Sequence, residues 1–120
     1  MQIKIYNTYK ELSENAANEV IELMSSSSNP LLCAASGDTP LGLYKVLAEN
    51  YLTRRTDFSS WAFIGLDEWM GMNGSDEGSC RYYIDRDLFQ PLHVDEHKIM
   101  FFDGRATNPL TECEAAENFI

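Results

Sequence analysis

Apolar side chains recur along the chain at two different spacings. Leu12, Ala16, Val20 and Leu23 follow helical spacing between about residues 8 and 24. Residues 31–35 and 61–66 are short continuous apolar runs, as expected of strands buried on both faces of a parallel sheet. In chain order, the pattern predicts a strand at 2–6, a helix at 8–24, a strand at 31–35, a helix from Pro40, a strand at 61–66, a helix at 79–89, a strand at 98–102 and a helix from Pro109.

Strands that alternate with helices predict an α/β fold, Rossmann-like, with three α/β/α layers and a mainly parallel sheet. The 120 residues form a single α/β domain, 1–120. The last helix reaches Ile120 without the Gly, Lys or Pro that commonly ends a helix. We therefore expect the sheet to be incomplete at the C-terminus and the chain to be the N-terminal portion of a longer domain.

The charge balance narrows the range of partners. With 19 acidic and 9 basic residues the net charge is −10, and no cluster of Lys and Arg interrupts it. This excludes nucleic acid and anionic membranes as partners, and no apolar run approaches the length of a membrane span. Three scattered cysteines without a CxxC pair indicate reduced thiols and a cytoplasmic protein. A small anion can still bind through backbone N–H groups, and a homo-oligomer is compatible with the sequence.

A small polar turn joins the predicted strand 31–35 to the helix that follows. Ser36, Gly37, Asp38 and Thr39 lie in this turn, beside the positive end of the helix dipole. Gly37 lets a ligand approach the backbone, and the hydroxyls of Ser36 and Thr39 add donors, so a phosphate is the expected occupant. The alternative is that Asp38 or Thr39 merely caps the helix.

Two adjacent carboxylates, Asp67 and Glu68, follow the predicted strand 61–66. In open α/β sheets ligands bind outside the carboxyl ends of the strands, which places Asp67 near the mouth that also holds the polar turn. A carboxylate partly shielded by Trp69 can act as a proton acceptor. The alternative is a solvated acidic turn or a helix cap.

His93 and His97 fit the H-x-x-E-H pattern of a zinc site, which needs a helix to place both imidazoles on one face. Pro91 precedes the segment and a strand is predicted at Lys98, so we interpret both histidines as exposed loop residues and expect no metal.

Two motifs together resemble a known family. Ala-Ser-Gly-Asp-Thr-Pro-Leu-Gly-Leu-Tyr at 35–44, followed by Phe-Ile-Gly-Leu-Asp-Glu-Trp-Met-Gly at 63–71, is similar to the glucosamine-6-phosphate deaminase/isomerase family. That family includes galactosamine-6-phosphate isomerases and is related to 6-phosphogluconolactonases. The resemblance implies that Ser36, Gly37, Asp38 and Thr39 bind the sugar phosphate. It also implies that Asp67 is the base that moves a proton between C1 and C2, with Glu68 as the adjacent catalytic-motif acid.

The implied reaction is aldose–ketose isomerisation of an amino-sugar phosphate with loss of ammonia, and it uses no cofactor. The sequence departs from the family in length, because members are about twice as long and their second half brings a Gly-x-Asp-Gly-His-type motif and further basic residues. A fragment of this kind is expected to have little turnover alone. Alternatives are a 6-phosphogluconolactonase, disfavoured by Trp69, and a non-catalytic sugar-phosphate sensor, disfavoured by retention of Asp67 and Glu68.

Overall fold

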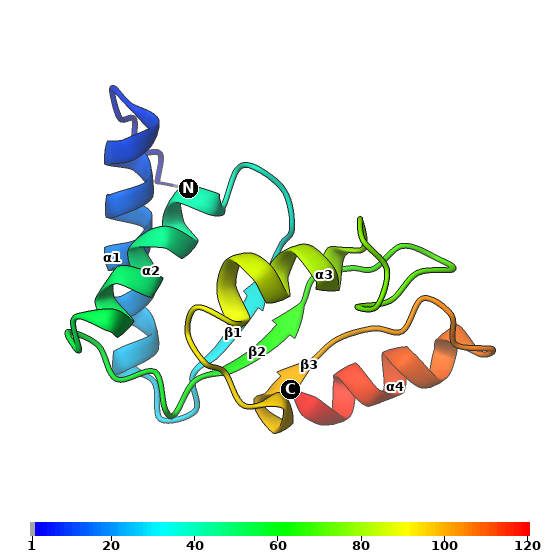
Figure 1. Cartoon of the computed structure of the whole chain (residues 1–120). Coiled ribbons are helices and arrows are strands. Elements are labelled where there is room, and N and C mark those ends of the chain that lie inside the picture. The colour runs from blue at the N-terminus through cyan, green and yellow to red at the C-terminus, as the bar shows by residue number, and fades with distance from the viewer. Residues whose placement is uncertain (1) are drawn as a thin grey trace.

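A three-stranded parallel sheet forms the centre of the computed structural model, which describes residues 2–120 (Figure 1). Strands β1 (Leu31–Ala34), β2 (Ala62–Gly65) and β3 (Ile99–Met100) lie in the order β1-β2-β3. The register pairs β1 with β2 from Leu31–Ala62 to Ala34–Gly65. Parallel neighbours require crossover connections, and here each crossover contains a helix.

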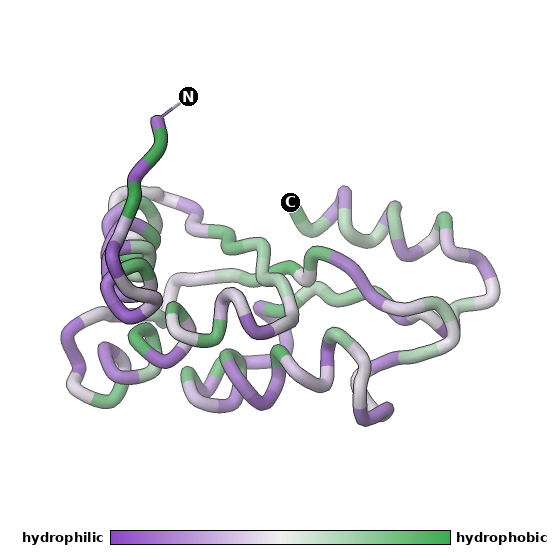
Figure 2. The backbone as a smooth tube through the Cα atoms, turned by 90° about the horizontal axis from the view of Figure 1, so that it is seen from above, coloured by the Kyte–Doolittle hydropathy of each residue, from purple (hydrophilic) through white to green (hydrophobic). Residues whose placement is uncertain are grey.

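Helices cover both faces of the sheet and give the expected three layers (Figure 2). One face packs against α2 (Leu41–Leu52), α3 (Cys80–Ile84) and the π-helix η1 (Asp85–Phe89), which continues α3. Helix α1 (Tyr9–Ser26) packs on α2, and α4 (Pro109–Phe119) lies on the opposite face beside β3. The predicted α/β fold and its layers are thereby confirmed.

Alternate residues of β2 supply the two halves of the core. Phe63 is fully buried in the larger cluster, together with Trp61, Leu47 and Leu88. Ile64 points to the other face, where it packs with Met100 and Ala116 of α4. Because both faces of β2 are covered, side chains on both faces of this strand must be apolar, and the sequence here is a continuous apolar run.

Several observed elements differ from the predicted ones, and one predicted strand does not form. The strand predicted at 2–6 is wrong: this segment is irregular, and Ile3 and Ile5 are 71% and 90% exposed, because no neighbouring strand among the described residues pairs with it. The helix predicted at 79–89 forms but changes from α to π at Asp85. The strand predicted at 98–102 shrinks to two residues, preceded by the 3₁₀ helix η2 (Glu96–Lys98). Within residues 2–120, no helix has the length and apolarity needed to cross a membrane.

Candidate functional site

The sheet register brings the two sequence motifs together. Because Ala34 pairs with Gly65, the residues that lie two positions further along each chain are Ser36 and Asp67. The Leu66 amide donates to the Ala34 carbonyl at 2.9 Å, so strand pairing continues to this point. Neighbouring parallel strands are about 4.8 Å apart. The polar turn and the carboxylate therefore start from adjacent positions at the carboxyl edge of the sheet.

The turn at 36–39, which we call the anchor loop, has an open face. Gly37 has φ +111°, a conformation that favours glycine, and a Cβ built on it would meet no atom within 4 Å. No side chain caps α2, whose N-cap is Pro40. The alternative in which Asp38 or Thr39 caps the helix is thus wrong. Both side chains remain exposed at the start of α2.

Two tyrosine hydroxyls hold the backbone around the anchor loop. Tyr44 donates to the Ala35 carbonyl at 2.7 Å and accepts from the Ala35 amide at 3.1 Å. Tyr9, from α1, accepts from the Gly42 amide at 2.7 Å and lies within donating distance of the Asp38 carbonyl at 3.0 Å. The loop is consequently fixed at both ends by side chains, although its own polar side chains are free to face a ligand.

Burial raises the pKa of Tyr44 to about 12, an effect that its hydrogen bond to Ala35 reduces. The side chain is only 4% exposed, because it packs in the core on the inner side of α2. Its hydroxyl therefore stays protonated and remains able to donate to the start of the anchor loop throughout the physiological pH range.

Glu68 connects the end of β2 to α3. Its carboxylate accepts hydrogen bonds from the amides of Trp69 at 2.8 Å, Cys80 at 2.9 Å and Arg81 at 3.0 Å. Acidic oxygens at a helix N-terminus satisfy otherwise unpaired amides and interact favourably with the helix dipole. Because both of its oxygens are engaged in this way, Glu68 is a structural clamp. Asp67, its neighbour, is exposed.

Two thiols lie close enough to Asp67 for its charge to affect them. Burial first, and then the negative charge of Asp67, raise the pKa of Cys33 on β1. Burial is also the main cause of the raised pKa of Cys80, and hydrogen bonding to Ser36 opposes it. Asp67 raises the pKa of Cys80 both by its charge and by a hydrogen bond. Both thiols therefore stay protonated at neutral pH.

The glycine-rich loop after Trp69 is held by the turn that follows β3. Gly71 donates to the Gly104 carbonyl at 2.6 Å, and Arg105 donates to the Gly71 carbonyl at 3.1 Å and forms an ion pair with Asp76. A Cβ on Gly104 would lie 2.0 Å from the Trp69 carbonyl oxygen. Only glycine permits this close approach, so the two loops form one rim beside Glu68.

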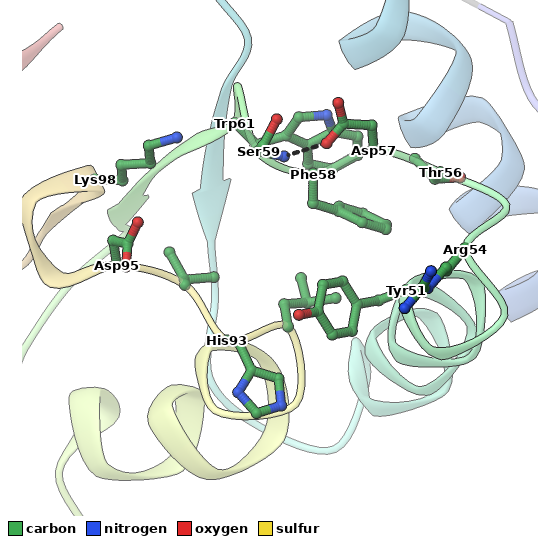
Figure 3. A pocket seen from close by; sticks show the side chains of 12 residues that line it. Tyr51, Arg54, Thr56, Asp57, Phe58, Ser59, Trp61, His93, Asp95 and Lys98 are labelled. Atoms are coloured by element: carbon green, nitrogen blue, oxygen red, sulfur yellow. Dashed lines mark hydrogen bonds between the residues drawn. The ribbon is translucent and has the colours of Figure 1, made fainter.

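A cavity of about 420 Å³ lies at the opposite, amino-terminal edge of the sheet (Figure 3). Tyr51, Phe58 and Trp61 form part of its wall, and His93 packs 5.6 Å from the Tyr51 ring. The cavity thus lies at the other end of the strands from Ser36 and Asp67. As predicted, His93 and His97 are exposed, and residues 93–97 do not form one α-helix.

The structure places the predicted site residues in two groups. Ser36, Gly37 and Asp67 face the same edge of the sheet, whereas the carboxylate of Glu68 is turned toward α3. The residues that sequence reasoning missed are Tyr9 and Cys80. Tyr9 lies 33 residues before its partner Gly42, so no local pattern connects them. Cys80 follows a serine N-cap, and its amide reaches the Glu68 carboxylate only because of tertiary packing.

Curated proteins that are similar to this chain include glucosamine-6-phosphate deaminases of several bacteria. The chain is 34% identical to a glucosamine-6-phosphate deaminase of Clostridium tetani, over 94% of this chain and 47% of that protein. It is 36% identical to one of Colwellia psychrerythraea, over 98% of this chain and 41% of that protein. No family model matches the sequence.

Solved structures agree with this class. A monomeric glucosamine-6-phosphate deaminase superposes with a TM-score of 0.90 at 27% identity, over 98% of this chain and 49% of that one. A 6-phosphogluconolactonase from Thermotoga maritima gives a TM-score of 0.75 at 20% identity, over 96% of this chain and 50% of that one, which shows the shared fold alone.

The fold is therefore the one shared by sugar-phosphate deaminases and lactonases. Within that class, its relatives by sequence are glucosamine-6-phosphate deaminases, which match 94–100% of this chain at 33–36% identity. It spans about half the length of the curated relatives it matches.

Proposed function

We propose that this chain supplies the phosphate-binding and proton-transfer part of an amino-sugar-6-phosphate isomerase/deaminase. The substrate is glucosamine-6-phosphate or galactosamine-6-phosphate, and the products are a ketose-6-phosphate and ammonia. The observation that supports this most directly is the register that sets Ser36 beside Asp67. One residue belongs to an open anion-binding loop and the other is an exposed carboxylate, so phosphate and reacting carbons can be held by neighbouring strands.

In this proposal Ser36, Gly37, Asp38 and Thr39 bind the phosphate, chiefly through backbone N–H groups at the start of α2. Asp67 takes the proton from C2 of the open-chain sugar and returns it to C1. The C1 oxygen gains a proton as the amine loses one, so that C1 becomes an alcohol and C2 an imine. Water then adds to the imine, and ammonia leaves as the C2 carbonyl forms. Binding at the remote phosphate lowers the entropic cost of placing C1 and C2 beside a single carboxylate.

We further propose that residues 1–120 are the N-terminal portion of a longer domain and have little turnover alone. The sheet supports this, because its two faces are unequally covered. Cys33 of β1 is exposed on the face where Ile64 and Met100 of the neighbouring strands meet α4. A second half would extend the layer that α4 begins and would bring the cations that a phosphate beside Asp38 requires. The three free cysteines are consistent with the cytoplasm.

The test measures ammonia release from both amino-sugar phosphates by the longest native form of the protein. Asp67→Asn is expected to reduce the rate by at least about a hundredfold, the usual contribution of a positioned base. Asp57→Asn is the matched control, because Asp57 lies at the opposite edge of the sheet. Equal rates for the wild type and Asp67→Asn would refute the assignment. Hydrolysis of 6-phosphogluconolactone without ammonia release would instead favour the lactonase function.

A further inference from the structure

The cavity at the amino-terminal edge of the sheet has the size and the aromatic wall of a small-molecule site (Figure 3). Its volume of about 420 Å³ lies within the range of about 300–1,000 Å³ that is usual for ligand pockets. In its wall, the rings of Phe58 and Trp61 have centroids 4.6 Å apart, and the Tyr51 ring meets that of Phe58 at 6.3 Å and 61°. Aromatic rings set at an angle offer a planar ligand both stacked and edge contacts.

Two unusual backbone positions lie at this cavity. Arg54 (φ +52°) and His93 (φ +50°) are the only non-glycine residues with positive φ within residues 2–120, and both line the cavity. Each follows the end of a helix in a Schellman motif: the Arg55 amide donates to the Asn50 carbonyl at 2.9 Å, and the same pattern of bonds surrounds His93. Glycine is the usual residue at this position, because a side chain there strains the backbone. Strained positions of this kind cluster at ligand sites.

Arg54 supplies this cavity with a cation that has no carboxylate partner. Within residues 2–120 it forms no salt bridge. Figure 3 shows Arg54 on the Tyr51 side of the cavity and Asp95 on the opposite side. A guanidinium binds a carboxylate or a phosphate through two parallel hydrogen bonds, and it also packs well against aromatic rings. The Tyr51 side of the cavity therefore combines an aromatic surface with a site for an anion.

We propose that this cavity binds a small molecule in which a planar ring carries an anionic group. The ring packs against Tyr51 and Phe58, and Arg54 binds the anionic group, with the His93 imidazole close by on the same side of the cavity. The inference does not depend on the proposed function, because the anchor loop and Asp67 lie at the other end of the strands.

Helix capping is the alternative role for Arg54 and His93. A cation that follows a helix interacts favourably with its last carbonyls, and this role requires no ligand. The competing ligand is a ring with a cationic group, because Asp57 and Asp95 also line the cavity. Asp57, however, already accepts a hydrogen bond from the Ser59 amide at 2.8 Å, whereas the Arg54 guanidinium has no hydrogen-bond partner within residues 2–120. This difference favours the anionic ligand.

A titration with 2-naphthoate tests the site in the longest native form of the protein. The two tryptophans give separate indole N–H signals in an NMR spectrum. Trp61 lines the cavity and its signal should move, whereas the signal of Trp69, beside Glu68 at the other edge of the sheet, should not. A Trp61 signal that stays in place, or equal shifts of both signals, would overturn the proposal.

Three related probes test the chemical class. Binding should be at least about tenfold weaker for 2-naphthylmethanol, which lacks the charge, since a hydrogen bond to a charged group is lost. Cyclohexanecarboxylate, which lacks the planar ring, should also bind more weakly than 2-naphthoate. Equal affinity for the alcohol, or tighter binding of 2-naphthylmethylamine, would refute an anionic ligand.

Substitutions at Arg54 separate ligand binding from helix capping. Arg54→Gln should weaken 2-naphthoate binding at least about tenfold and leave 2-naphthylmethanol binding unchanged. Arg55→Gln is the matched control, because Arg55 is the adjacent exposed cation and does not line this cavity. Arg54→Gly should lose the same affinity without a lower midpoint of urea unfolding, because glycine relieves the strain at positive φ. If both Arg54 variants bind 2-naphthoate as the wild type does, Arg54 only caps α2 and the proposal fails.

Discussion

Replacing Tyr44 with phenylalanine removes one oxygen atom that makes two hydrogen bonds to the same residue, Ala35. The ring is 4% exposed, so phenylalanine fills the same space and only the polar interaction is lost. Each ordinary hydrogen bond contributes about 1 kcal/mol, and an amide and a carbonyl are left without their partner. We expect Tyr44→Phe to lower the free energy of unfolding by about 2–3 kcal/mol at neutral pH.

The assay is urea unfolding of the wild type and Tyr44→Phe, with Tyr83→Phe as the control, because the Tyr83 ring is 36% exposed and its hydroxyl makes no hydrogen bond within residues 2–120. Amide hydrogen exchange at Ala35 reports the same change locally and should become faster in Tyr44→Phe. A loss below about 0.5 kcal/mol, equal to that of the control, would refute the reasoning, because the anchor loop would then be held without Tyr44.

Three further predictions follow from contacts described above. The pKa of Tyr44 is about 12 in the folded chain and about 10 in the unfolded chain, so the unfolded state loses its proton first as the pH rises. The free energy of unfolding, measured in urea, should therefore fall by up to about 3 kcal/mol between pH 10 and 12. This pH-dependent loss should be absent in Tyr44→Phe. Gly42→Ala would set a Cβ 2.1 Å from the Ser13 hydroxyl oxygen and should cost about 1–3 kcal/mol by thermal unfolding, whereas Gly37→Ala, with open space around it, should show only backbone strain. Glu68→Gln should cost about 1–3 kcal/mol in urea unfolding, because an amide group presents only one acceptor to the amides of α3, and an unchanged midpoint would contradict the clamp.

The elements that could be predicted are those whose signal is local. The helix at Tyr9–Ser26 and the strand at Ala62–Gly65 follow from spacing alone, because burial repeats at the period of the element. The alternation of residues 2–6 is equally regular, yet no strand forms, because a strand also requires a neighbour that sequence periodicity does not supply.

In the candidate site, too, features with a local signal could be predicted and features that depend on distant residues could not. The anchor loop and Asp67 were identified from their place after apolar strands, and the sheet register confirms that the two motifs are adjacent. The role of Glu68 could not be read from the sequence, because the amides that it accepts from are 12 and 13 residues away. Tyr9 was missed for a similar reason, since it reaches Gly42 only when α1 packs on α2.

The change from α to π geometry at Asp85 sets the rotational phase of the whole third helix. A π turn takes up one more residue than an α turn, so it offsets the side chains before it from those after it. Leu88 and Phe89 are buried in the core, and Cys80 in the first turn is also buried, with its amide bound to Glu68. Deleting one residue between 85 and 89 would restore a regular helix and turn Cys80 by about 100°. The number of residues between 85 and 89 therefore matters to the fold as much as their identity does. Insertions or deletions in this segment should be tolerated less than in the exposed turn at 53–57.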